Sequence, residues 1–128
     1  MLINTSKEPI LFSEKIFKIN RWSLKQERIL VLTVRSVYIF RKKCRIYIVC
    51  LTNSIALRKK LLIEDLRSIV KSLTSNEFIL HFPSFFDIRM QCERRDDFLN
   101  IIKLRFAHLN PKFTLKVYGV VRISKHNC

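Results

Sequence analysis

Glycine and proline are scarce in this sequence, which has one glycine, Gly119, and three prolines among 128 residues. Almost half of the residues are apolar, and ten of them are phenylalanine. This composition is typical of a folded globular chain and not of a disordered one. The length favours one domain with a modest core. No glycine-rich phosphate loop and no nucleophile elbow is present, so we expect no enzymatic activity.

Long apolar runs and paired cysteines are also missing. The longest uncharged run, Ile46–Leu57, has 12 residues and includes the polar stretch Thr52–Ser54. It is too short and too polar to span about 30 Å of hydrocarbon, so we expect no transmembrane helix. The four cysteines show no CxxC spacing, and no signal peptide precedes them. We therefore expect reduced cysteines and a cytoplasmic protein.

Acidic residues are the third scarcity: 10 Asp and Glu stand against 25 Lys and Arg, for a formal net charge of +15. Such an excess attracts polyanions and makes an anionic partner the first expectation. The charge is uneven along the chain. Residues 1–60 contain 14 Lys and Arg against three Glu, whereas residues 61–128 contain 11 against seven acidic residues. The positive field thus belongs mainly to the first half.

The basic residues of the first half gather around a predicted hairpin. Segments rich in apolar and β-branched residues cover Phe12–Asn20, Arg28–Thr33 and Ser36–Phe40, which predicts the first sheet of a small barrel with a basic mouth. The candidate binding residues are the cations on these strands and at their ends: Lys18, Arg21, Lys25, Arg28, Arg41 and Lys42. The basic triplets 41–43 and 58–60 are typical of solvated strand ends, and they enlarge the basic surface.

Trp22 and Leu24 lie among these charges in the turn between the first two strands. Two interpretations of Trp22 are open. It is either a rim residue that covers the open end of the barrel or an aromatic wedge at a membrane interface.

A second group of strands is predicted further along the chain, followed by one helix. The predicted strands are Leu61–Ile63, Leu66–Leu73, Glu77–Phe82 and Phe86–Cys92. From Glu93 to Leu109 the period changes to about 3.6, and the apolar residues form one stripe: Phe98, Ile101, Ile102, Phe106 and Leu109. Carboxylates in the first turns suit the start of a helix, and Asn110–Pro111 ends it.

The pattern predicts an α+β, pleckstrin-homology-like fold, in which about seven antiparallel strands form an open barrel capped by one C-terminal amphipathic helix. We expect a flexible lead-in over residues 1–10, the domain over 11–110 and an extension over 111–128, which either packs on the barrel or begins a further segment. The run Ile46–Leu57 is left open as an extra strand, an inserted hairpin or a loop.

Several blocks of the sequence, taken in order, resemble the tail homology domain of class I myosins and its stand-alone relatives. The similarity covers roughly residues 11–109, and the blocks that carry it are Lys18–Arg21, Gln26–Thr33, Val37–Ile39, Leu61–Leu66 and Ser75–Phe82. The chain departs from that family in a longer and more apolar stretch over 41–57 and in a basic loop without glycine. It shows no motor and no calmodulin-binding helix, so the resemblance does not imply a myosin role.

The resemblance implies a pleckstrin-homology-like fold that binds phosphoinositide headgroups and anionic phospholipid through its first strand, first loop and second strand. By position, Lys18 matches the first-strand lysine and Arg28 the basic residue of the second strand, while Arg21 and Lys25 fall in the loop. We therefore expect a peripheral protein on the cytoplasmic face of membranes.

Physical chemistry supports the same function without the family. A phosphorylated inositol ring is a compact polyanion, and converging Lys and Arg side chains give it several charge-assisted hydrogen bonds. The alternative function is a protein-interaction module in a cytoskeletal or signalling assembly, because such barrels also bind peptides along a strand edge. Nucleic acid is disfavoured, since no RNA-recognition signature is present. The three histidines lack metal-ligand spacing with the cysteines, so we expect no metal and no cofactor.

Overall fold

The computed structural model describes residues 8–41 and 57–124. Within these residues the chain forms eight strands, one short 3-10 helix and one α-helix. In chain order they are β1 (Ile10–Ile19), β2 (Lys25–Thr33), β3 (Ser36–Arg41), β4 (Leu57–Leu62), η1 (Ile63–Asp65), β5 (Ser68–Ser72), β6 (Glu77–His81), β7 (Ile88–Gln91), α2 (Arg95–Leu109) and β8 (Lys116–Val120). The strands make one sheet in the order β4-β3-β2-β1-β7-β6-β5-β8.

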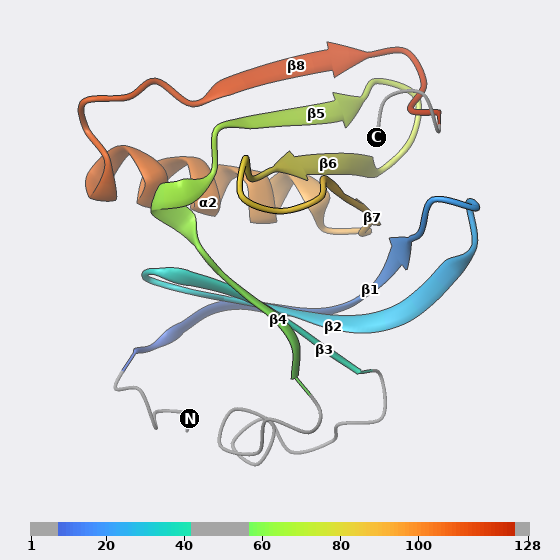
Figure 1. Cartoon of the computed structure of the whole chain (residues 1–128), viewed down its shortest axis with the longest axis horizontal. Coiled ribbons are helices and arrows are strands. Elements are labelled where there is room, and N and C mark those ends of the chain that lie inside the picture. The colour runs from blue at the N-terminus through green and yellow to red at the C-terminus, as the bar shows by residue number, and fades with distance from the viewer. Residues whose placement is uncertain (1–7, 42–56, 125–128) are drawn as a thin grey trace.

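Strand β1 links the two halves of this sheet. It pairs with β2 along most of its length and with β7 near its C-terminal end, where Phe17 lies opposite both Glu27 and Gln91. The sheet therefore bends over itself, with β1–β4 in one layer and β5–β8 in the other (Figure 1). The buried side chains of both layers face each other and form the main core.

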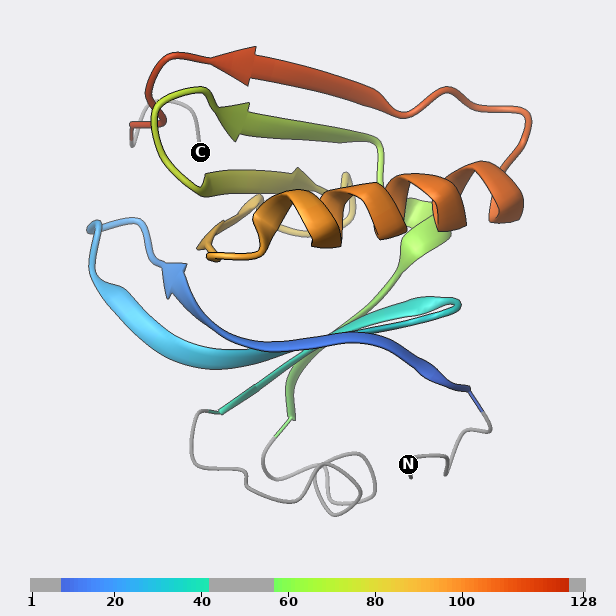
Figure 2. The same ribbon diagram turned by 180° about the vertical axis from the view of Figure 1, so that it is seen from behind.

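The helix α2 covers one side of the barrel, and it lies in front of the sheet in Figure 2. Its apolar stripe supplies Phe98, Ile102 and Phe106, which are fully or almost fully buried. The ring of Phe98 lies 5.3 Å from that of Phe12 in β1 and 5.6 Å from that of Phe78 in β6, measured between centroids. Contacts from the helix to both layers close this side of the barrel.

Two arginines of α2 fix the helix to the sheet by hydrogen bonds to backbone carbonyls. Arg95 Nη1 donates to the carbonyl oxygens of Ser72, Ser75 and Glu77 at 2.8, 2.7 and 3.1 Å. One turn from the other end of the helix, Arg105 Nε donates to the Val34 carbonyl at 2.9 Å. The helix is thus fixed to the turn after β5 and to the turn between β2 and β3.

The predicted strand meander and terminal helix are confirmed, with three differences. Strand β4 begins at Leu57 and not at Leu61. Strand β7 begins at Ile88 and not at Phe86, so Phe86 lies in a loop and is 87% exposed. Lys42 lies outside the described residues, and so do residues 46–56 of the run Ile46–Leu57, for which the sequence predicts no single structure.

The third difference is the eighth strand, which makes the sheet partly parallel. Within the expected extension, β8 pairs in parallel with β5, with Ile69 opposite Val117. The backbone N–H of Leu73 donates to the Val120 carbonyl at 2.7 Å. Beyond the strand, Ile123 is only 4% exposed. Of the two alternatives for the extension, this part packs on the barrel, because its apolar segment pairs with the edge of β5.

Candidate functional site

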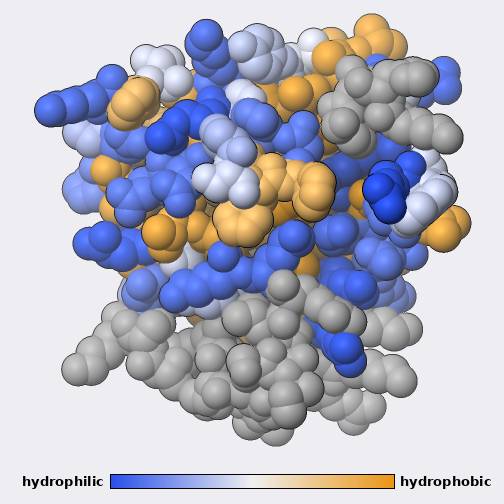
Figure 3. Space-filling model, viewed as in Figure 1, coloured by the Kyte–Doolittle hydropathy of each residue, from blue (hydrophilic) through white to orange (hydrophobic). Residues whose placement is uncertain are grey.

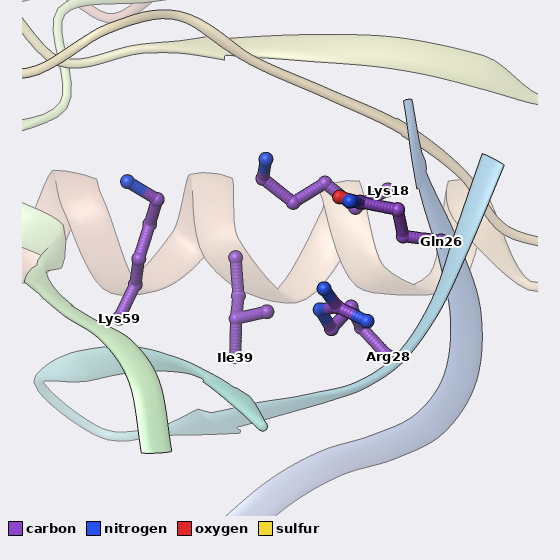
Figure 4. A pocket seen from close by; sticks show the side chains of 5 residues that line it. All are labelled: Lys18, Gln26, Arg28, Ile39 and Lys59. Carbon is purple, nitrogen blue, oxygen red and sulfur yellow. The ribbon is translucent and has the colours of Figure 1, made fainter. Parts of the chain in front are cut away.

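A cationic pocket of about 320 Å³ lies between the side chains of β1, β2, β3 and β4 (Figure 4). We define the pocket by the five residues that line it: Lys18, Gln26, Arg28, Ile39 and Lys59. Figure 4 shows the side chains of β1, β2, β3 and β4 converging on this space, with α2 behind them. The helix and the pocket thus lie on opposite sides of the barrel.

The pairing of β1 with β2 places three of these side chains on one face of the sheet. Lys18 lies opposite Gln26, and Ile16 lies opposite Arg28. Directly opposed residues of antiparallel strands project to the same face, and the burial of Ile16 identifies this face as the inner one. The sequence therefore has polar and cationic residues at inner positions where the barrel opens to solvent.

The pairing of β3 with β2 and β4 adds a second lysine to the same face. The buried Ile39 lies opposite Lys59 in β4, and Arg41 lies opposite Arg28 in β2. Lys59 thus reaches the pocket from the strand farthest from Lys18 in this half of the sheet. Arg41 is exposed at the end of β3 and does not line the pocket.

The pocket holds three positive charges close together, those of Lys18, Arg28 and Lys59. Burial lowers the pKa of the Lys18 ammonium below its ordinary value, and the positive charges of Lys59 and Arg28 lower it further. No carboxylate in the described part of the chain forms an ion pair with Lys18. Arg28 Nη1 donates to the Glu27 carbonyl at 2.7 Å. Lys18 thus carries its charge in a partly buried position beside two other cations.

Two of the predicted site residues lie outside this pocket. Arg21 lies in the turn after β1, where its guanidinium carbon is 4.4 Å from the centroid of the Trp22 ring. Lys25 lies on the outer face of β2, with its Nζ 5.6 Å from the centroid of the Phe17 ring. Both cations are exposed. The structure therefore brings together Lys18 and Arg28 of the predicted cluster and separates Arg21 and Lys25 from them.

The turn that carries Arg21 has a defined geometry. Asn20 Oδ1 accepts hydrogen bonds from the backbone N–H groups of Trp22 and Leu24 at 2.9 and 3.0 Å. Ser23 takes up the left-handed backbone region with φ of 63°. The turn presents Trp22 to solvent, with 64% of its surface exposed.

Sequence reasoning missed Gln26, Ile39 and Lys59 as pocket residues. For Lys59 a signal was present, since it is the middle residue of the basic triplet 58–60. Because the fourth strand was predicted to start only at Leu61, the triplet could not be assigned a face of the sheet. In the structure β4 begins at Leu57, and its register on β3 places Lys59 opposite the buried Ile39. Lys59 therefore faces inward.

Two other kinds of feature, a metal site and a membrane-spanning helix, are not seen in the part of the chain that the structure describes. No group of three or more His, Cys, Asp or Glu side chains there could hold a metal ion. The described helices include none that is long and apolar enough to cross a membrane.

Solved structures similar to this one contain pleckstrin-homology domains. The human ARAP2 N-terminal PH domain aligns with a TM-score of 0.61 and 10% identity, covering 79% of this chain and 83% of that chain. The PH domain of human oxysterol binding protein-related protein 11 aligns with a TM-score of 0.58 and 15% identity, covering 76% and 80%. The hSac2 domain of human phosphoinositide phosphatase Sac2 aligns with a TM-score of 0.60 and 10% identity, covering 92% and 80%. The matches to the two PH domains confirm the predicted pleckstrin-homology-like fold.

The identities of these structures are low and show the fold alone, whereas a family model shows the family. No curated protein gives a significant match to this chain. Residues 1–127, however, match the model of a family described as unconventional myosin tail, actin- and lipid-binding. The match spans nearly the whole chain and agrees with the predicted resemblance. The chain therefore belongs to the unconventional myosin tail family, the actin- and lipid-binding tail domains.

Proposed function

We propose that this chain is a non-enzymatic membrane-targeting module that binds anionic phospholipids, with a phosphoinositide headgroup in the cationic pocket. One observation carries the proposal: Lys18, Arg28 and Lys59 face one space of about 320 Å³, where burial, and then the charges of Lys59 and Arg28, lower the pKa of Lys18. The lipid-binding description of the family supports the same class of partner.

A phosphorylated headgroup suits this pocket in both size and charge. The volume lies at the small end of ligand sites, which suits one compact ring better than an extended ligand. Arg28 offers a planar fork of N–H donors, whereas Lys18 and Lys59 act as point charges. The amide of Gln26 adds a neutral donor and acceptor beside them. A phosphate in this space replaces repulsion among three cations by attraction to an anion.

The remaining predicted residues would act outside the pocket. Arg21, Lys25 and Arg41 are exposed cations near its edge, and Lys42 follows Arg41 in the sequence. Near an anionic leaflet each basic residue contributes about 1 kcal/mol of attraction. We propose that these residues give a diffuse attraction to anionic lipid, which places the protein on the cytoplasmic face of membranes as a peripheral component.

Co-sedimentation with vesicles tests the proposal. Vesicles of neutral lipid, of lipid with phosphatidylserine, and of lipid with phosphatidylserine and phosphoinositide are compared for the wild type and for Lys18→Ala/Lys59→Ala. The control is Lys112→Ala/Lys116→Ala, which removes the same charge from two exposed lysines outside the pocket.

We expect binding that depends on phosphoinositide and is lost in Lys18→Ala/Lys59→Ala but kept in the control. Equal losses in both variants would reduce the site to diffuse charge and overturn the pocket. Failure of the wild type to bind any of the vesicles would overturn lipid binding itself.

The family description also supports a second candidate, a protein-interaction function with actin as the partner to test first. The net charge of +15 and the position of β8 at one end of the sheet suit an acidic partner that approaches this edge. Co-sedimentation with actin filaments, with and without phosphoinositide vesicles, separates the two functions.

A further inference from the structure

Two neighbouring phenylalanines are exposed in the segment between β6 and β7. Phe85 has 53% of its surface exposed, and Phe86 has 87%, the largest value among the large apolar side chains of the described residues. Single exposed apolar residues are normal on protein surfaces, but an adjacent aromatic pair is a feature of interaction sites. We refer to these two residues as the phenylalanine tip.

Buried neighbours and short hydrogen bonds hold the tip outward. Phe82 and Ile88, on either side of it, are buried in the core. The backbone N–H of Phe85 donates to the Phe82 carbonyl at 2.9 Å, which closes a tight turn. Across the base of the loop, His81 Nδ1 and Asp87 Oδ1 are 2.5 Å apart. With both ends fixed in this way, neither ring reaches the core.

The tip lies beside the cationic pocket. Nζ of Lys59, which lines the pocket, is 6.0 Å from the centroid of the Phe85 ring. Figure 3 shows an apolar patch in the middle of this face, over the segment between β6 and β7, with hydrophilic residues around it. The helix α2 lies on the opposite side (Figure 2). An apolar projection and a cationic pocket thus share one face of the molecule.

We propose that the phenylalanine tip inserts into the acyl-chain boundary of an anionic bilayer when the pocket holds a lipid headgroup. This inference rests on the proposed function and adds a second, apolar contact to it. Headgroup phosphates lie at the level of the bilayer interface, and aromatic side chains partition just below them. Lys59 and Phe85 lie side by side, so this face offers a cation to the phosphates and an aromatic ring to the layer below them.

Charge favours a bilayer as the occupant over a second copy of this chain. Each copy carries a net charge of +15, and the cations around the tip would face those of the partner. A leaflet with anionic lipid instead supplies phosphates for Lys59 and hydrocarbon for Phe85 and Phe86. The one carboxylate of the loop, Asp87, makes a hydrogen bond with His81 at the base of the loop.

Fluorescence measures the insertion directly. Trp22 is the only tryptophan, so Phe86→Trp in a Trp22→Phe background places one reporter on the tip. The matched control is Leu104→Trp in the same background, because Leu104 is 73% exposed on α2, away from the pocket. Vesicles contain phosphatidylserine and phosphoinositide, with bromine on the acyl chains of a fraction of the lipids as a quencher.

We expect a blue shift and bromine quenching for the tip reporter and neither for the Leu104 reporter. In co-sedimentation, Phe85→Ala/Phe86→Ala should weaken binding on the order of tenfold or more, since an aromatic ring loses its apolar burial at each position. Leu104→Ala should leave binding unchanged. The loss in the tip variant should persist at high salt, which screens the contribution of the pocket but not that of apolar burial.

The outcomes separate this inference from the proposed function. Binding by the wild type, with no quenching at the tip and no loss in Phe85→Ala/Phe86→Ala, would overturn insertion and leave headgroup binding intact. Quenching that also occurs at the Leu104 reporter would overturn the orientation. Failure of the wild type to bind these vesicles would overturn both.

Discussion

Replacing Lys18 by methionine should stabilise the fold while it removes headgroup binding. Methionine keeps most of the length of the lysine stem but not its charge, so packing against the pocket wall is largely retained. The substitution removes an ammonium that burial disfavours and that Lys59 and Arg28 repel. A residue maintained against the stability of the fold is typical of a functional site.

The expected gain follows from the position of Lys18. The side chain is only half-buried and keeps part of its contact with solvent, so the gain should be comparable to that of other optimised charges, about 0.5–2 kcal/mol. For a chain of this size, 1 kcal/mol corresponds to a shift in Tm of about 4 °C.

The gain should also depend on pH with a definite sign. Between the lowered pKa of Lys18 and the ordinary value of 10.5, the unfolded chain binds more protons than the folded one. The free energy of unfolding of the wild type therefore rises with pH in this window. The advantage of Lys18→Met should be largest below the window and should vanish above pH 10.5.

Urea unfolding at a series of pH values between 7 and 11 measures both effects. The control is Lys15→Met, which removes a charge from an exposed position of the same strand and should change the free energy of unfolding by less than about 0.5 kcal/mol. A less stable Lys18→Met, or a gain that does not change with pH, would refute the reasoning about the pocket.

Three other predictions concern stability and can be measured by the same unfolding experiment. Phe98→Ala removes the ring that packs on Phe12 and Phe78 and should cost about 3–5 kcal/mol; a loss below 1 kcal/mol would contradict the assigned core. Asn20→Ala leaves the N–H groups of Trp22 and Leu24 without their acceptor and should lower the free energy of unfolding by about 1 kcal/mol. Asn20→Ser retains an acceptor, so it should leave the free energy of unfolding almost unchanged. Ser23→Gly should raise stability by up to about 1 kcal/mol, because φ of 63° suits glycine; destabilisation would argue against this turn.

Alternation and helical periodicity were sufficient to predict most of the fold. The inner face of β7 follows from the alternation of apolar residues, and the apolar stripe of α2 follows from a period of 3.6. These are local signals, which each segment carries by itself. They fail at Phe86, which continues the alternation of β7 but lies in the loop before it, because the hydrogen bond of Phe85 to Phe82 closes a turn there.

The candidate site depended on pairing between segments, which local patterns do not reveal. Lys18 and Arg28 could be linked because a short turn joins their strands. Lys59 comes from a strand whose register on β3 includes an irregularity between Ile39 and Phe40, and no sequence rule fixes such a shift. The parallel pairing of β8 with β5 was beyond reach for the same reason.

The most direct test of the pocket is isothermal titration of the protein with a soluble inositol phosphate, because it removes the membrane and its diffuse charge. We predict saturable binding to one site in the wild type and in Lys112→Ala/Lys116→Ala, and no measurable binding in Lys18→Ala/Lys59→Ala. Binding of equal strength in all three proteins, or in none of them, would contradict the assignment of Lys18, Arg28 and Lys59 as a headgroup site.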